Sequence, residues 1–162
     1  MKCLVVYSSK SGNTQKVAKA VYDNISEDKE IFAMADAPDP EGYDFVAVGF
    51  WLMAGQPDPD SQAYLAKITE GQDVFLFATH GAAVGSPHAN SGMDSAVAMA
   101  AKGHVIATFS CAGQVSEKVL EMAAKKDPQP PWLADAPAAV GHPNDLDMKY
   151  VSRLMEELDM FE

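Results

Sequence analysis

The chain has 162 residues, of which 48% are hydrophobic and 22% charged, which fits one domain with a sizeable buried core. Its formal net charge of −11 argues against nucleic acid and anionic membranes as partners and favours basic proteins. No apolar run approaches the roughly 18–20 residues of a membrane-spanning helix. The first strand pattern begins at Lys2 without a secretory signal, so we expect a cytoplasmic protein.

The first half of the chain alternates between strand and helix patterns. Residues 4–7 are a short apolar run, typical of a strand buried on both faces. A helix is expected over 14–26, because Val17, Val21 and Ile25 recur at intervals of four. The next expected elements are a strand at 30–34, a strand at 45–48 and a helix at 60–69.

The second half continues the alternation. The expected elements are a strand at 74–78, a helix at 91–101, a strand at 104–109 and a helix at 115–126. The proline-rich stretch at 128–143 predicts an extended loop. A last helix over 144–160 carries apolar residues at intervals of four, namely Leu146, Tyr150, Leu154 and Leu158. This pattern predicts a single α/β domain over 1–162, a three-layer sandwich around a five-stranded parallel sheet.

The turn after the first strand is rich in hydrogen-bond donors. Residues 8–14 read Ser-Ser-Lys-Ser-Gly-Asn-Thr, with four hydroxyls and a glycine just before a helix. Free amides at a helix N-terminus bind phosphate, and ligands of open parallel sheets lie at the carboxyl ends of strands. Neither GxxxxGK[ST] nor GxGxxG is present, which favours a phosphate monoester held by neutral donors, with Lys10 adding charge at the rim. The alternative is that the serine and asparagine side chains only cap the helix.

The segment Ser9-Lys10-Ser11-Gly12-Asn13-Thr14 resembles the [TS]-x-[TS]-G-x-T loop that wraps the FMN phosphate in flavodoxins, and it matches every fixed position. The resemblance implies FMN as cofactor and a flavodoxin-like sheet with strand order 2-1-3-4-5. The last strand has no long insertion, as in short-chain flavodoxins. The segment Gly49-Phe50-Trp51 further resembles a small flavodoxin-like family of anaerobic bacteria.

The resemblance also implies which loops border the flavin ring. Trp51 is expected to stack on the inner face, and the Ala54-Gly55 peptide to flip and donate an N–H to flavin N5. The alternative for Trp51 is packing against the next helix. The stretch from Thr79 is expected to give backbone hydrogen bonds to the ring edge. The ring contacts implied are Trp51, Leu52, Ala54, Gly55, Thr79, His80 and Gly81.

The loop after the fourth strand departs from the common flavodoxin pattern. Many flavodoxins place a tyrosine there, on the outer face of the ring, and this chain has none between Thr79 and His88. Either His80 or an aliphatic side chain covers that face, or the ring is more open. The two cysteines, Cys3 and Cys111, lack CxxC spacing, and buried thiols are expected, with a redox role for Cys111 as the alternative.

The resemblance implies a low-potential electron carrier that serves basic redox partners, most simply as a monomer. The excess of carboxylates makes reduction of the flavin to an anion costly, which lowers the second potential. One alternative is an FMN-dependent reductase of the quinone or protoporphyrinogen type, with the loop at 127–143 and its Trp132 walling a substrate pocket. Another is a flavin-free interaction module, against which the intact phosphate loop argues. No metal cluster is expected.

Overall fold

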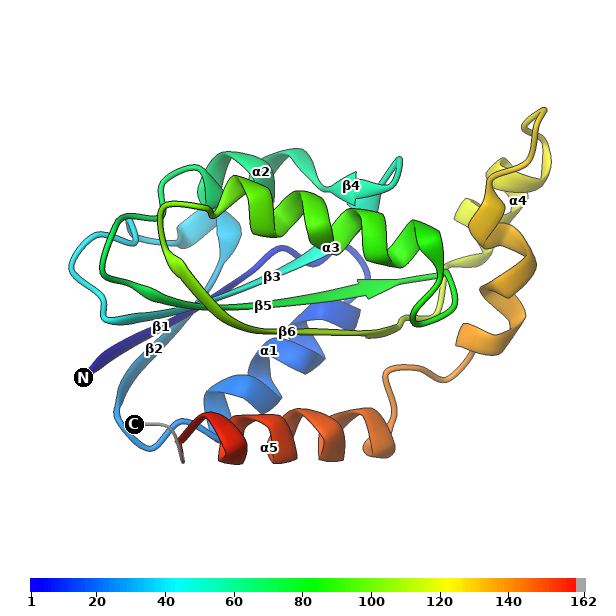
Figure 1. The fold of residues 1–162 in the computed structure, drawn as a ribbon. Coiled ribbons are helices and arrows are strands. Elements are labelled where there is room, and N and C mark those ends of the chain that lie inside the picture. The colour runs from blue at the N-terminus through cyan, green and yellow to red at the C-terminus, as the bar shows by residue number, and fades with distance from the viewer. Residues whose placement is uncertain (160–162) are drawn as a thin grey trace.

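A computed structural model of the chain describes residues 1–159, and its parallel sheet carries helices on both faces (Figure 1). The strands are β1 (Lys2–Tyr7), β2 (Asp28–Ala33), β3 (Phe45–Met53), β4 (Gln56–Pro57), β5 (Asp73–His80) and β6 (His104–Ala112). The α-helices are α1 (Asn13–Asp23), α2 (Pro59–Leu65), α3 (Pro87–Met99), α4 (Glu117–Ala124) and α5 (Asp145–Asp159). Two 3₁₀ helices complete the fold, η1 (Met34–Asp36) and η2 (Pro131–Ala139).

The strand order is β2-β1-β3-β5-β6, and all of these neighbours run parallel. The short β4 pairs antiparallel with the end of β3 and lies off this path. With β4 set aside, the predicted order 2-1-3-4-5 is confirmed. The chain moves outward from β1 to β2 and then crosses back to β3, so the order reverses between β1 and β3. Ligands of open α/β sheets bind outside the carboxyl ends of the strands at this reversal.

The two faces of the sheet bury separate clusters, because successive strand side chains point to opposite sides. One cluster joins strand residues such as Val48 and Phe50 to Leu65 of α2 and Ala96 of α3. The other joins Phe75 and Phe77 of β5 to α1 and α5. Figure 1 shows these two helix pairs on opposite sides of the sheet. The three-layer sandwich is therefore confirmed.

Several element boundaries differ from prediction by a few residues, and two of the differences concern the carboxyl edge of the sheet. β3 extends to Met53, so Trp51 and Leu52 lie in the strand and not in a loop. The stretch expected to be extended contains the 3₁₀ helix η2, which begins at Pro131, where the missing proline N–H costs no helical bond. The expected helix end at residue 160 lies outside the described residues.

The buried face of α5 is also shifted from the predicted one. Leu146 and Tyr150 are 58% and 54% exposed, whereas Val151 and Met155 are buried. A spacing of four drifts around a helix of 3.6 residues per turn, so four such positions do not stay on one narrow stripe. Only the later part of the predicted stripe, at Leu154 and Leu158, packs against the core.

Candidate functional site

The carboxyl edge of the sheet begins with the loop after β1, which lies at the N-terminus of α1. Gly12 precedes the helix with φ +93°, a left-handed conformation that favours glycine. The Ser9 hydroxyl oxygen accepts the N–H groups of Gly12 (3.1 Å) and Gln15 (3.3 Å). The N–H groups of Asn13 and Thr14 open the helix and have no acceptor one turn back inside it. The loop therefore brings backbone N–H groups and hydroxyls together at a helix N-terminus, which is the kind of place where proteins bind anions.

Two of the predicted phosphate ligands tie this loop to the rest of the edge. Thr14 is buried, and its Oγ1 lies 2.8 Å from Oγ1 of Thr79 on β5. The Asn13 amide donates to the carbonyl oxygen of Gln114, beyond β6, at 3.0 Å. Lys10 and Ser11 are exposed instead. The side chains that point outward at the rim are therefore those of Lys10 and Ser11.

Trp51 stands beside this loop, on the face of the sheet that carries α1. Its neighbours along β3, Phe50 and Leu52, pack in the cluster under α2 and α3. Alternation therefore directs the indole to the other side, away from the helix that follows it. The Lys10 ammonium lies 5.4 Å from the centroid of the indole, and Trp51 pairs in register with Thr79. A half-buried aromatic face thus borders the loop at 8–14, which we call the phosphate loop after the role predicted for it.

Leu52 and His80, both predicted ring contacts, have their side chains on the opposite face from Trp51. Leu52 packs against Gly92 of α3. His80 is buried, and its Nδ1 lies 2.9 Å from the carbonyl oxygen of Ala82, which can only accept. Nδ1 therefore carries the proton, and Nε2 is an acceptor with no partner among residues 1–159. Burial lowers the pKa of His80, helped by nearby His88 and opposed by the bond to Ala82, so the ring is neutral at pH 7.

The predicted flip position forms the turn between β3 and β4. Ala54 has φ +53° and Gly55 φ +77°, the two positive values of a tight hairpin turn. Ala54 is the one residue other than glycine with positive φ in the described part of the chain. A left-handed alanine costs roughly 1–2 kcal/mol, and such strain is often found at functional sites. The His88 ring at the start of α3 lies close to Gly55.

Asp58 is a residue that the sequence analysis missed. It is only 2% exposed and caps α2, where it accepts from the Ser61 backbone N–H and hydroxyl. It also accepts the Ser8 hydroxyl at 2.7 Å and the Trp51 backbone N–H at 3.3 Å. One carboxylate therefore joins the ends of β1 and β3 to the start of α2. The Asp58-Pro59 pair is a recognisable helix start, but nothing local indicates the partners on β1 and β3.

Cys111 lies at the end of β6 and is buried. Burial and the neighbouring Asp147 carboxylate raise the pKa of its thiol to about 12. Thiol reactivity depends on the thiolate, which is scarce at neutral pH for such a group. The geometry favours a structural thiol over a redox thiol.

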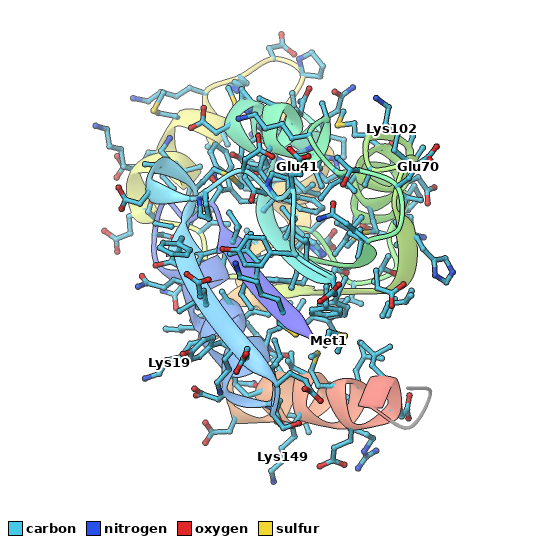
Figure 2. All side chains as sticks on the ribbon, turned by 90° about the vertical axis from the view of Figure 1, so that its left-hand side faces the viewer. Met1, Lys19, Glu41, Glu70, Lys102 and Lys149 are labelled. Carbon is cyan, nitrogen blue, oxygen red and sulfur yellow. The ribbon has the colours of Figure 1, made fainter. Side chains whose placement is uncertain are left out.

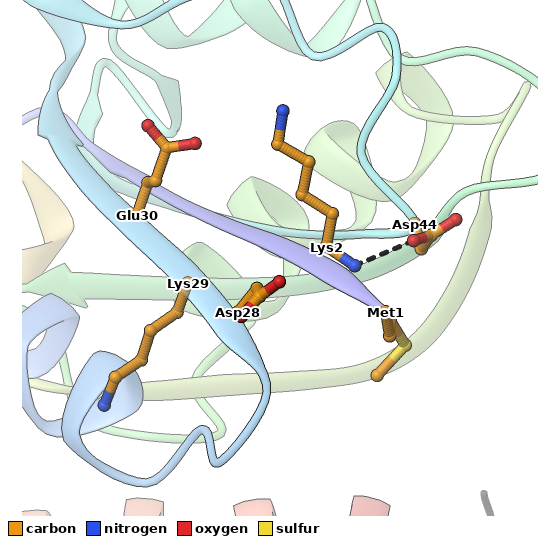
Figure 3. Close-up of a pocket in the computed structure, with 6 residues that line it drawn as sticks. All are labelled: Met1, Lys2, Asp28, Lys29, Glu30 and Asp44. Carbon is orange, nitrogen blue, oxygen red and sulfur yellow. Dashed lines mark hydrogen bonds between the residues drawn. The ribbon is translucent and has the colours of Figure 1, made fainter.

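A hollow lies at the other end of the strands, away from this edge. It measures about 560 Å³ and is lined by Met1, Lys2, Asp28, Lys29, Glu30 and Asp44 (Figure 3). Figure 2 looks onto this amino-terminal edge, with Met1 toward the viewer. Its charges are of both signs, and it is distant from the carboxyl ends where ligands of such sheets bind.

Within residues 1–159, no group of three or more His, Cys, Asp or Glu is placed to hold a metal ion. None of the helices described here is long and apolar enough to span a bilayer.

Comparison with known proteins agrees with this geometry. A family model described as a flavodoxin domain matches residues 4–156. The chain belongs to the flavodoxin family. It is 34% identical over 122 residues to the flavodoxin-like domain-containing protein BilS of Clostridioides difficile strain CD3, an alignment that covers 72% of this chain and 69% of BilS.

Solved flavodoxins share the fold over the whole chain. The Streptococcus pneumoniae TIGR4 flavodoxin superimposes with a TM-score of 0.66 and 12% identity, covering 100% of both chains. A Fusobacterium nucleatum flavodoxin bound to flavin mononucleotide gives a TM-score of 0.64 and 11% identity, covering 99% of this chain and 98% of that one. At these identities the likeness concerns the fold, which matches the one predicted from the sequence.

The role of Asp58 can be tested with Asp58→Asn. Oδ1 accepts the N–H of Trp51 and Oδ2 that of Ser61, so either orientation of the amide turns an NH₂ toward a backbone donor. We expect the free energy of unfolding to fall by about 1–3 kcal/mol in urea titrations. Asp60→Asn, an exposed neighbour on α2, should cost less than about 1 kcal/mol. Equal losses in the two variants would contradict the role given to Asp58.

A second prediction concerns the pH dependence of stability. Because the pKa of His80 is lower in the folded chain than the ordinary 6.5, the unfolded chain takes up this proton first as the pH falls. The contribution of His80 is fully present above about pH 6.5 and is lost as the pH drops toward its lower folded pKa. Urea titrations at about pH 7.5 and 5.5 should show a smaller loss on acidification in His80→Phe than in the wild type. An equal loss in both proteins would exclude His80 as the titrating group.

Proposed function

We propose that this chain binds FMN non-covalently at the carboxyl edge of the sheet and carries electrons between redox proteins. The observation that supports it most is the loop at 8–14, where the first N–H groups of α1 and the exposed Ser11 lie together near the indole of Trp51. A phosphate suits the first part and a flat aromatic ring suits the second. FMN carries both groups in one molecule.

The residues divide the binding of FMN between them. The hydroxyls of Ser9 and Ser11, with the first N–H groups of α1, hold the phosphate, and Lys10 adds a positive charge at the rim. The side chains of Thr14 and Asn13 keep the loop in place through Thr79 and Gln114. Bound FMN supplies the one-electron chemistry, and the protein supplies position and electrostatic environment.

Electrostatics favours a low potential and a basic partner. The formal net charge is −11, and the buried His80 is neutral, so it gives no cation to offset negative charge on a reduced flavin. A surrounding excess of negative charge disfavours further reduction. The same charge attracts a basic docking surface and speeds encounter at low salt.

An FMN-dependent reductase is the second candidate. It is favoured by the position of Trp132, which lies against Gly81 just after β5, because a reductase would need a wall for its substrate at this edge. Such an enzyme needs a direct reductant and a small acceptor, whereas a carrier needs two proteins. The two candidates therefore differ in what they react with and not in where FMN binds.

The cofactor assignment predicts that FMN binds much more tightly than riboflavin, which lacks the phosphate. Ser11→Ala removes an exposed donor from the loop and should weaken FMN about ten-fold or more, while riboflavin affinity is unchanged. Ser26→Ala, an exposed serine beyond the far end of α1, is the control and should bind both ligands as the wild type does. Flavin fluorescence titration gives the Kd values. Equal affinity of the wild type for FMN and riboflavin would overturn the assignment.

Carrier and reductase are separated by stepwise anaerobic reduction of the FMN-loaded protein. A carrier should take up its two electrons in separate one-electron steps, and its exchange with a basic partner should slow as salt rises, because screening shortens the reach of charge to about 10 Å at 0.1 M. A reductase should be reduced in one two-electron step by NAD(P)H and turn over quinones without a partner protein. The second result would transfer the assignment to the enzyme.

A further inference from the structure

Residues 113–143, which we call the strap, connect β6 to α5 and belong to neither helix layer. The strap contains α4 and η2, and Figure 1 shows both beyond the carboxyl end of β5. That is the edge at which the phosphate loop and Trp51 lie. A long connection at this edge is either a simple linker between β6 and α5 or a part of the site. The contacts of the strap distinguish these two possibilities.

The base of the strap is fastened to the phosphate loop. The Gln114 N–H donates to the carbonyl of His142 at 2.8 Å, and the Gly141 N–H donates to Gln114 Oε1 at 2.9 Å, so the two ends of the strap lie together. The Gln114 carbonyl in turn accepts the side-chain amide of Asn13 at 3.0 Å. Gln114 therefore holds the two ends of the strap together and also binds Asn13 at the start of α1.

The middle of the strap reaches the end of β5. A Cβ on Gly81 would lie 3.3 Å from Cε3 of the Trp132 indole and 2.7 Å from Cγ2 of Val115, so a larger residue there would force these side chains to shift. The Asp135 carboxylate accepts the N–H of Ala83 at 3.2 Å. An aromatic ring and a hydrogen bond therefore hold the strap against the segment that follows His80.

The chain has only two tryptophans, and both lie at this edge. Trp51 pairs in register with Thr79, and Trp132 covers Gly81, two residues further along the same strand direction. Neither indole belongs to the core clusters, and each is only partly buried. Each indole therefore keeps part of a large apolar face available at this edge, and such a face suits contact with another flat ring.

We infer that Trp132 is a second aromatic contact of the flavin ring, and that the strap is a wall of the cofactor site. This rests on the proposed function, since it needs FMN at the carboxyl edge. The contact is made to the ring and not to the phosphate. The hydrogen bond between Asn13 and Gln114 then connects the segment that contacts the phosphate to the segment that contacts the ring.

The test compares Trp132→Leu, Trp132→Tyr and a control on the same strap, Met122→Ala, whose side chain on α4 is 58% exposed. The Kd values for FMN and riboflavin and the fluorescence lifetime of the bound flavin are measured for each folded variant. An indole in contact with an excited flavin quenches it by electron transfer, so the lifetime reports contact and not stability. Trp132→Leu should weaken FMN and riboflavin alike, by about ten-fold, and lengthen the lifetime. Trp132→Tyr should restore most of the flavin affinity and most of the shortening of the lifetime. Met122→Ala should match the wild type in both measurements.

The outcomes separate this inference from the function on which it rests. If Trp132→Leu keeps the wild-type Kd and lifetime while the wild type still prefers FMN to riboflavin, the inference is wrong and FMN binding stands. A drop in melting temperature with an unchanged lifetime assigns Trp132 to packing and also overturns it. If Trp132→Tyr loses as much flavin affinity as Trp132→Leu, the inference is also overturned. A wild-type protein that binds no FMN removes both proposals together.

Discussion

The carboxylate of Asp58 connects three elements that would otherwise end independently at the carboxyl edge of the sheet. Its two oxygens accept from Ser8 after β1, Trp51 on β3 and Ser61 on α2. Burying a carboxylate is costly unless hydrogen-bond donors satisfy its oxygens. The burial of Asp58 therefore depends on the four hydrogen bonds that it accepts. The spacing between the phosphate loop and the indole, on which a phosphate-and-ring ligand depends, follows from these bonds.

Donor chemistry at this edge is largely neutral. Hydroxyls and backbone N–H groups make up the phosphate loop, Lys10 stands at its rim, and the buried imidazole of His80 is uncharged. A site of oriented dipoles holds an anion without adding full positive charge near the redox centre. The overall charge of the protein then sets the electrical environment of any bound flavin, together with its attraction for basic surfaces.

The sequence predicted the features that depend on neighbouring residues. The alternation of apolar runs indicated the parallel sheet, and the run of hydroxyls and glycine at 8–14 indicated a loop followed by a helix, because these signals are adjacent in the chain. Contacts between distant residues were not predictable in this way. Ser8 and Asp58 are 50 positions apart, and Asn13 and Gln114 are 101 apart. The placement of Trp51 and Leu52 in a loop was wrong because β3 continues to Met53, and alternation along the strand then directs their two side chains to opposite faces of the sheet.

The hydrogen bond between Asn13 and Gln114 joins two segments that are 101 positions apart in the chain. One end belongs to the phosphate loop and the other to the base of the strap, which is exposed along α4. Thermodynamic linkage makes such coupling reciprocal: if a ligand in the loop steadies the strap, a partner that prefers the steadied strap raises the affinity of the loop by the same factor. A carrier built in this way would hold its cofactor more tightly while docked than while it diffuses alone.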